Sequence, residues 1–241
     1  MLLPELLSVA LAAFAAWSLL RALLPNRRRR LLDQPNARSS HSQPTPLGGG
    51  VVFVLVAAAA SAIGLFGAAF SAQPGLPGSQ WAMVTLPLLA LPLAVVGFLD
   101  DRHNLPAGLR YGVQLATALQ LILVTPLPLP WLGLPLLLIA VTAVINFTNF
   151  MDGLDGLVAG CMVLLFAVAA FNGMPALWPL VGALLGFLLW NWSPAKVFMG
   201  DVGSTFLGAV FAGVVLQQVN FQAVAIADLP ERLRRGAGRY P

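Results

Sequence analysis

The chain contains four long stretches without a single Asp, Glu, Lys or Arg: residues 39–99, 111–151, 157–195 and 202–227. Each stretch is long enough for one or two membrane spans of about 20 residues. Water-soluble domains normally carry about 25% charged residues. Because only 9% of these 241 residues are charged and 59% are hydrophobic, a soluble fold and a disordered chain are both excluded. The sequence therefore predicts an integral membrane protein.

Clusters of Gly and Pro divide these stretches, since both residues interrupt helices. The clusters lie at residues 71–80 (SAQPGLPGSQ), 126–130 (PLPLP) and 172–175 (NGMP). We expect an all-α fold, a polytopic transmembrane helical bundle that forms a single domain over residues 1–221. Its eight predicted spans are residues 4–24, 47–70, 81–99, 111–125, 131–150, 156–171, 176–192 and 202–221.

Charged residues are confined to alternate connections between these spans. The first, third, fifth and seventh connections, residues 26–46, 100–110, 151–156 and 193–201, carry charges, whereas the second, fourth and sixth carry none. Short loops with Lys and Arg stay in the cytoplasm. We therefore expect all charged connections on the cytoplasmic face of the membrane and the N-terminus outside. Residues 222–241 form an atypical basic tail, which this topology places on the outer side.

The third connection begins with two adjacent carboxylates, Asp100 and Asp101, in the segment GFLDDRHNLPAGLR. Adjacent carboxylates repel each other, and a divalent cation or a basic side chain is their natural partner. Arg102 and Arg110 are candidate phosphate ligands in the same segment. The alternative is a solvated helix end whose two arginines lie at the membrane surface.

The fifth connection follows the segment NFTNFMDGLDG, in which polar side chains recur every three residues. On a helix this spacing places Asn146, Asn149 and Asp152 on one face, with Asp155 one step further along. Buried carboxamides need partners, and a nucleotide or a metal-bound water would supply them. The alternative is that these residues only cap the helix ends and form the turn. That explanation accounts for Asp155 but not for Asn146, Asn149 and Asp152.

The seventh connection, in NWSPAKVFMGDVGSTFLG, places Asp201 at the start of a predicted helix, with Asn191 and Lys196 upstream. Free backbone N–H groups beside a carboxylate could seat a phosphate together with a cation. Asp201 could equally be an ordinary helix N-cap.

The first connection combines four arginines with DQPNARSSHSQPTPLGGG. The arginines are more typical of an orientation signal than of a catalytic element. Arg38, Ser40 and His41 bring several donors together beside a glycine run that permits close backbone approach. The two histidines, His41 and His103, have no metal-binding partner at short spacing, and the single cysteine excludes a disulfide scaffold.

In order and spacing, these four segments resemble the sequence blocks of the polyprenyl-phosphate N-acetylaminosugar-1-phosphate transferases, over about residues 33–208. The stretch PNARSSH is most similar to the O-antigen type of glycosyltransferase family 4. The resemblance implies that undecaprenyl phosphate attacks the β-phosphorus of a UDP-N-acetylamino sugar and releases UMP, with Mg2+ as cofactor. The implied partners are these two substrates and membrane lipid, without nucleic acid, and a homodimer is left open.

The resemblance also assigns roles by position. It makes Asp100 and Asp101 the diacid that binds the metal-nucleotide or activates the lipid phosphate, and Asp201 a metal ligand. It places Asn149, Asp152 and Asp155 along the nucleotide pocket, and Asn191 and Lys196 near the diphosphate.

Two alternatives to an active enzyme stay open. Family members carry a His-containing loop after the last predicted span, so the resemblance implies a chain that is truncated at its C-terminus and could be inactive. A non-enzymatic transporter is the second alternative, although transporters bind near the membrane midplane and often show repeated halves.

Overall fold

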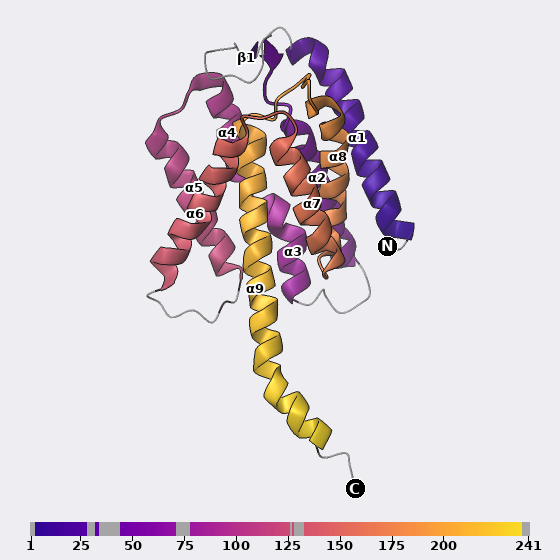
Figure 1. Ribbon diagram of the computed structural model, residues 1–241, viewed down its shortest axis with the longest axis vertical. Coiled ribbons are helices and arrows are strands. Elements are labelled where there is room, and N and C mark those ends of the chain that lie inside the picture. Colours follow the sequence, from indigo (N-terminus) through magenta and orange to yellow (C-terminus); the bar gives the residue numbers. More distant parts are fainter. Residues whose placement is uncertain are drawn as a thin grey trace.

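The computed structural model describes residues 3–27, 32–33, 44–70, 78–125, 127 and 133–237. Within these residues the protein is an all-α bundle, as predicted (Figure 1). Two short strands, β1 (Leu32–Asp33) and β2 (Thr45–Pro46), pair antiparallel with Leu32 opposite Pro46. The helices are α1 (Leu3–Arg27), α2 (Val51–Phe70), α3 (Gly78–Leu89), α4 (Leu91–His103), α5 (Ala107–Leu123), α6 (Gly133–Met151), α7 (Leu157–Phe171), the 3-10 helix η1 (Pro175–Leu177), α8 (Trp178–Asn191) and α9 (Asp201–Ala237).

Each of the eight predicted spans corresponds to helix, with two differences. The third span is divided at Ala90 into α3 and α4, because Pro87 and Pro92 lack the N–H groups that a continuous helix needs there. The eighth span was expected to end at residue 221, but α9 continues to Ala237. No Gly or Pro lies between residues 214 and 229 to stop the helix at the expected point.

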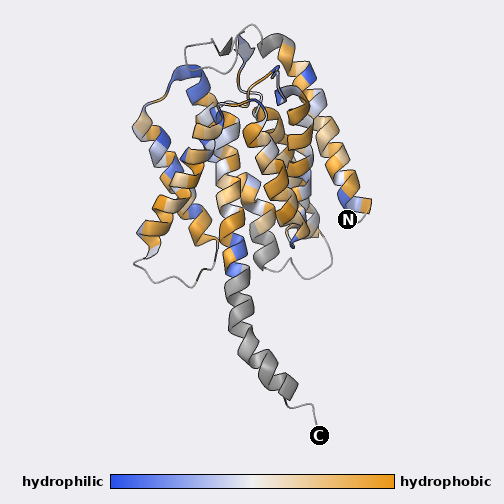
Figure 2. Ribbon diagram, viewed as in Figure 1, coloured by the Kyte–Doolittle hydropathy of each residue, from blue (hydrophilic) through white to orange (hydrophobic). Residues whose placement is uncertain are grey.

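Among the described residues, five segments are long and apolar enough to cross a membrane. These segments are Leu3–Leu24, Val51–Phe70, Met83–His103, Gly133–Met151 and Asp201–Asn220, and the apolar segments Leu157–Phe171 and Pro175–Asn191 are shorter. Figure 2 shows hydrophobic residues along the helices and hydrophilic residues gathered where α4 ends and α9 begins. The protein is therefore an α-helical polytopic membrane protein.

Helix α9 is the central helix of the bundle and packs against each helix from α2 to α7. Glycines let neighbouring backbones approach it closely. A Cβ atom on Gly208 would lie 2.9 Å from the Cα of Ile145 on α6, and one on Gly50 would lie 2.6 Å from the Cα of Gly203. The contact between Gly50 and Gly203 agrees with the close approach that the glycine run predicts.

Helix α1 lies at the edge of the bundle and packs mainly on α8 (Figure 1). Two glycines one helical turn apart, Gly182 and Gly186, face it. A Cβ atom on Gly182 would overlap the carbonyl oxygen of Val9, and one on Gly186 would overlap that of Ala13. This small-xxx-small spacing is a common way for helices to pack closely inside a membrane.

The described parts of the four charged connections meet at one end of the bundle, as predicted. Phe198 donates its backbone N–H to Pro46 (2.9 Å), and Gly49 donates to Phe198 (2.8 Å), so the first and seventh connections pair. The third and fifth connections reach the same end through side chains described below. The first residue of α1 lies at the opposite end (Figure 1).

Candidate active site

The two adjacent aspartates at the end of α4 point to different partners. The Asp100 carboxylate accepts the backbone N–H of Leu105 (Oδ1, 2.6 Å) and the Arg110 guanidinium (Oδ2, 2.7 Å). Asn104 ends α4 in the left-handed conformation (φ 51°), which turns the chain towards the start of α5. Asp100 therefore fastens this turn and holds Arg110 beside it.

Asp101 binds the first turn of α9 instead. Its Oδ1 atom accepts the backbone N–H of Asp201 (3.0 Å), and its Oδ2 atom accepts that of Val202 (3.4 Å). A carboxylate at this position satisfies N–H groups that have no partner within the helix and interacts favourably with the helix dipole. Gly97 makes the approach possible, because a Cβ atom there would overlap the Asp201 carbonyl oxygen.

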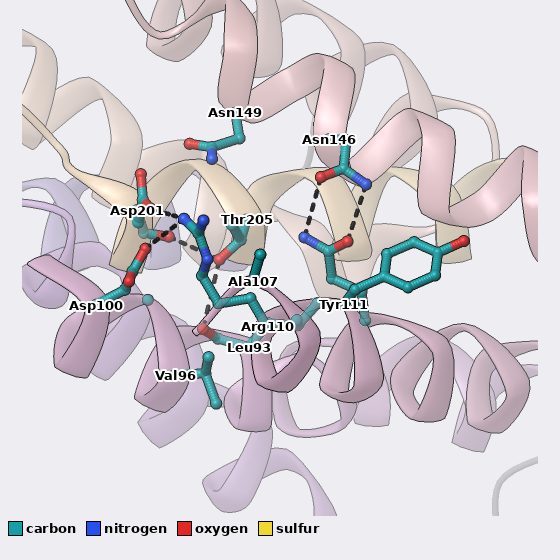
Figure 3. A pocket seen from close by; sticks show the side chains of 12 residues that line it. Leu93, Val96, Asp100, Ala107, Arg110, Tyr111, Asn146, Asn149, Asp201 and Thr205 are labelled. Atoms are coloured by element: carbon teal, nitrogen blue, oxygen red, sulfur yellow. Dashed lines mark hydrogen bonds and ion pairs between the residues drawn. The ribbon is translucent and has the colours of Figure 1, made fainter. Parts of the chain in front are cut away.

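Asp201 lies together with Asp100 beside one arginine, Arg110 (Figure 3). Its Oδ2 atom lies 4.0 Å from Nη1 of Arg110, the same nitrogen that binds Asp100. The Asp201 side chain is 30% exposed and that of Arg110 39%, whereas that of Asp100 is only 6% exposed. The structure thus brings Asp100, Asp101 and Asp201 together, as the sequence predicts, and adds Arg110 between two of them.

A cavity of about 270 Å³ opens beside this group. Helices α4, α5, α6 and α9 line it with Leu93, Val96, Gly97, Asp100, Ala107, Arg110, Tyr111, Gln114, Asn146, Asn149, Asp201 and Thr205. The charged residues lie at one end of the cavity, and the carboxamides continue along α5 and α6 (Figure 3). Apolar residues of α4 form another wall. The cavity can therefore take a ligand that has both phosphate and apolar parts.

Two carboxamides bridge α5 and α6 inside the cavity. The Gln114 Nε2 atom donates to Asn146 Oδ1 (3.2 Å), and Asn146 Nδ2 donates to Gln114 Oε1 (2.8 Å) (Figure 3). Sequence reasoning identified Asn146 but missed Gln114, Tyr111 and Thr205. The spacing of four residues between Arg110 and Gln114 places both on one face of a helix and could have revealed Gln114.

Asn149 also lies in the cavity, and α9 fixes its orientation. Ser204 donates its hydroxyl to Asn149 Oδ1 (2.6 Å), and Thr205 donates to the Asp201 carbonyl oxygen (2.6 Å). The Asn149 amide nitrogen is thereby directed away from Ser204 and can donate to a ligand.

Asp152 lies in the turn after α6, partly buried near the carboxylates of α4 and α9. Burial raises the pKa of this carboxyl well above its ordinary value of 3.8, and the negative charges of Asp201 and Asp101 raise it further. Asp152 therefore lies close enough to Asp101 and Asp201 for their negative charges to favour its protonated form.

Asp155 and Asn191 join the fifth and seventh connections. The Asn191 amide donates to the Val197 carbonyl oxygen (2.9 Å) and accepts the N–H of Gly156 (3.2 Å). Asp155 accepts the N–H of Ala195 through Oδ2 (2.9 Å), and its buried Oδ1 atom has no hydrogen-bond partner. Neither residue lines the cavity, and their contact with a substrate stays a prediction.

The other predicted ligands lie further from the cavity or beyond the described part of the chain. The Lys196 Nζ atom is 5.7 Å from the centre of the Trp190 ring, and the Arg102 guanidinium is 4.3 Å from that of Phe98. Both basic side chains are exposed. Arg38, Ser40 and His41 lie outside the described residues.

The predicted metal site has the right donors in an incomplete arrangement. Among the described residues, no three His, Cys, Asp or Glu side chains are grouped as a ready metal site. The reason is that Asp100 is turned to Leu105 and Arg110, and Asp101 to the first turn of α9. Carboxylate oxygens are the ligands that Mg2+ prefers, and the like charges of Asp100 and Asp201 favour a cation between them. The residues therefore fit Mg2+ in chemistry and charge.

Comparison with known proteins places the chain in a family. Residues 83–219 match the sequence profile described as glycosyl transferase family 4. The chain belongs to this family. The matched range includes every residue that lines the cavity. The candidate site is thus built from the part of the chain that defines glycosyl transferase family 4.

Three relatives with curated names, each similar over most of this chain, have 32–35% identity to it. "Probable undecaprenyl-phosphate N-acetylglucosaminyl 1-phosphate transferase" of Bacillus subtilis is 32% identical over 199 residues, which are 73% of this chain and 52% of the relative. "Phospho-N-acetylmuramoyl-pentapeptide-transferase" of Shouchella clausii is 32% identical, covering 88% and 74%. The protein of that name from Deinococcus radiodurans is 35% identical, covering 85% and 73%. The chain spans about half the length of the Bacillus relative.

Proposed function

We propose that the protein transfers an N-acetylamino-sugar 1-phosphate from a UDP-sugar to undecaprenyl phosphate and so starts a lipid-linked glycan, such as O-antigen or a related cell-envelope polysaccharide. The observation that carries this proposal is the meeting of three aspartates and Arg110 at the mouth of a cavity between membrane helices. A phosphate group needs cations and donors, and a polyprenyl tail needs apolar helix surfaces. The site offers both at one place.

In the proposed reaction, a phosphate oxygen of undecaprenyl phosphate forms a bond to the β-phosphorus of the UDP-sugar. The bond from that phosphorus to the oxygen bridging the two phosphates breaks, and UMP leaves with this oxygen. The lipid phosphate is largely ionised at neutral pH, because its second pKa is about 6, so the reaction does not require a strong general base. The main tasks of the protein are to position the phosphates and stabilise their charge.

Arg110 and the carboxamides of the cavity are suited to these tasks. The Arg110 guanidinium can donate to two phosphate oxygens at once. Asn149 and Asn146 lie along the same wall and can donate to substrate oxygens. We further propose that Asp152, Asp155, Asn191 and Lys196 serve the nucleotide side, next to the cavity.

A Mg2+ ion bound here would neutralise the negative charge that builds up on the phosphate oxygens. Asp201 and Asp100 would hold it, because both carboxylates face Arg110 and the cavity. Asp101 would act beside them by fixing the backbone at Asp201.

The site is proposed to face the cytoplasm, in the inner membrane of a bacterium. The charged connections lie at the same end of the bundle as the aspartates, and loops rich in Arg stay in the cytoplasm. A transporter is less well supported, since the carboxylates lie at helix ends and not near the membrane midplane.

Transfer can be tested with the purified protein in detergent, undecaprenyl phosphate, Mg2+ and a labelled donor. We expect UMP release with UDP-GlcNAc, and we expect Asp201→Asn to abolish it. Arg21→Gln on α1 is the matched control, because it removes an exposed charge far from the site. UDP-MurNAc-pentapeptide is the second donor, and activity with it alone would assign the protein to the reaction named for the Shouchella relative. No UMP from any UDP-N-acetylamino sugar would overturn the proposal.

A further inference from the structure

We propose that Arg110 is an exchangeable counter-ion, which occupies the position of the divalent cation between Asp100 and Asp201 and moves to a substrate phosphate when that cation binds. This inference rests on the proposed function, since it assumes a substrate with a diphosphate. It concerns the binding of the divalent cation and the nucleotide, which precedes the transfer reaction.

The geometry shows why the two cations would compete. One nitrogen of Arg110, Nη1, lies 2.7 Å from Asp100 Oδ2 and 4.0 Å from Asp201 Oδ2. The other Asp100 oxygen accepts the Leu105 N–H at 2.6 Å. Both Asp100 oxygens therefore already accept a hydrogen bond, and a divalent cation at Oδ2 would lie beside the like-charged guanidinium, so its binding favours the departure of Arg110.

Charge balance explains why a cation is favourable between Asp100 and Asp201. Asp100, Asp101 and Asp201 form one group of carboxylates where α4 ends and α9 begins. Within the part of the chain that the structure describes, Arg110 contacts two members of this group, Asp100 and Asp201. Like charges placed together without a counter-charge repel strongly at low dielectric. Arg110 would therefore keep the empty site folded, and the metal would take over that task.

The two partners differ in freedom of movement. The Asp100 side chain is 6% exposed and fixed by the backbone of Leu105, whereas that of Arg110 is 39% exposed. Arg110 lies in the first turn of α5, beside the cavity. The exchange would thus move the long arginine side chain while the carboxylates stay in place. Once released, the guanidinium has the planar shape that binds phosphate oxygens in pairs.

Binding of Mn2+ alone, followed by electron paramagnetic resonance on the purified protein without nucleotide, measures the first half of the exchange. We expect Arg110→Gln to lower the Kd for Mn2+ about tenfold, which corresponds to ~1.4 kcal/mol. Arg102→Gln removes the same charge from the nearby C-terminal end of α4, but its guanidinium lies on Phe98. We expect this variant to change the Mn2+ Kd by less than about twofold, in keeping with the weak coupling of exposed charges.

The second half of the exchange, in which Arg110 binds a substrate phosphate, predicts that Arg110→Gln has the opposite effect on nucleotide affinity. With Mg2+ present, Arg110→Gln should weaken the binding of UDP-GlcNAc about tenfold, since a charge-assisted contact to phosphate is lost. A merely structural role for Arg110 would not tighten one ligand and weaken the other. Arg110→Lys keeps the positive charge but lacks the planar guanidinium, and we expect its Mn2+ affinity to lie between those of the wild type and Arg110→Gln. If Arg110→Gln does not fold, the Mn2+ and nucleotide measurements are made on Arg110→Lys instead.

Asp100→Asn in the Arg110→Gln background provides a further test. If Arg110 and the metal share Asp100, the added change should raise the Mn2+ Kd at least about tenfold, because a metal ligand is lost. An unchanged or weaker Mn2+ affinity in Arg110→Gln, or an unchanged affinity on adding Asp100→Asn, would overturn the exchange. Failure of sugar transfer with the Mn2+ results intact would overturn the proposed function alone.

Discussion

Asp101 caps the helix that begins at Asp201, one hundred residues further along the chain: its carboxylate accepts the Asp201 backbone N–H at 3.0 Å. Its neighbour Asp100 faces α5 and the cavity. Consecutive residues on a helix point in different directions, so an Asp-Asp pair can serve two partners. One aspartate fixes where α9 begins, and the other holds the arginine of the site. The distance between α4 and α9, and with it the position of Asp201, depends on this capping.

The first prediction separates the capping role of Asp101 from a chemical one. Asp101→Ala removes both acceptors and should lower the free energy of unfolding by about 1–2 kcal/mol, as loss of a helix cap does. Asp101→Asn keeps one acceptor oxygen and should recover at least half of that loss. Thermal unfolding in detergent measures the difference.

Activity of the same two variants completes this test. If capping is the main role, UMP release should follow stability and survive partly in Asp101→Asn. Complete loss of UMP release in a stable Asp101→Asn variant would instead assign Asp101 to the reaction itself.

The helices and the meeting of the acidic segments could be predicted from the sequence, because both depend on charge. A charged side chain is costly in the membrane, so the charge-free stretches mark the spans and the remaining carboxylates collect at their ends. The alternation of charged and uncharged connections then places Asp100, Asp152 and Asp201 on one side. The break at Ala90 depends on two prolines within an apolar stretch, a weaker signal that the hydrophobicity of residues 81–99 conceals.

Side-chain partners could not be predicted, because they depend on tertiary distances. Asn191 and Asp155 have polar side chains that are as suitable for a nucleotide as for a loop, and the structure shows them bonded to Val197 and Ala195. Gln114 was missed for the opposite reason. It is one of several uncharged polar residues within a charge-free stretch, and its place in the cavity wall and its pairing with Asn146 distinguish it from the others.

The second prediction concerns the packing of α1. Gly186→Leu should displace α1 from α8, because even a Cβ atom at this position would overlap the carbonyl oxygen of Ala13. Overpacking of this kind costs about 1–3 kcal/mol, and a larger loss is expected against backbone atoms. Gly67→Leu on α2 is the matched control, since nothing lies within 4 Å of its Cβ position. Equal melting temperatures for the two variants would contradict the packing seen here.

The third prediction concerns the carboxamide pair between α5 and α6. Gln114→Leu removes both hydrogen bonds between Gln114 and Asn146, although Asn146 still donates to the Thr142 carbonyl oxygen, and should cost about 1–2 kcal/mol of stability, together with substrate affinity. The exchanged pair, Gln114→Asn with Asn146→Gln, restores both donors and acceptors and should recover most of the stability. If the double variant is no better than the single one, the pair is not a stabilising contact.

The fourth prediction is a pH dependence caused by Asp152. Because its pKa is raised by burial and by Asp201 and Asp101, the folded protein keeps a proton there that the unfolded chain loses near pH 3.8. Stability therefore falls as the pH rises from about 3.8 through the raised pKa, and the deficit is constant above it. Asp152→Asn cannot ionise, so its melting temperature should equal that of the wild type below pH 3.8 and exceed it at neutral pH, by about 2–4 °C for a gain of ~1 kcal/mol. Measurements without added divalent cation are decisive, and a difference that does not change with pH would refute this account of Asp152.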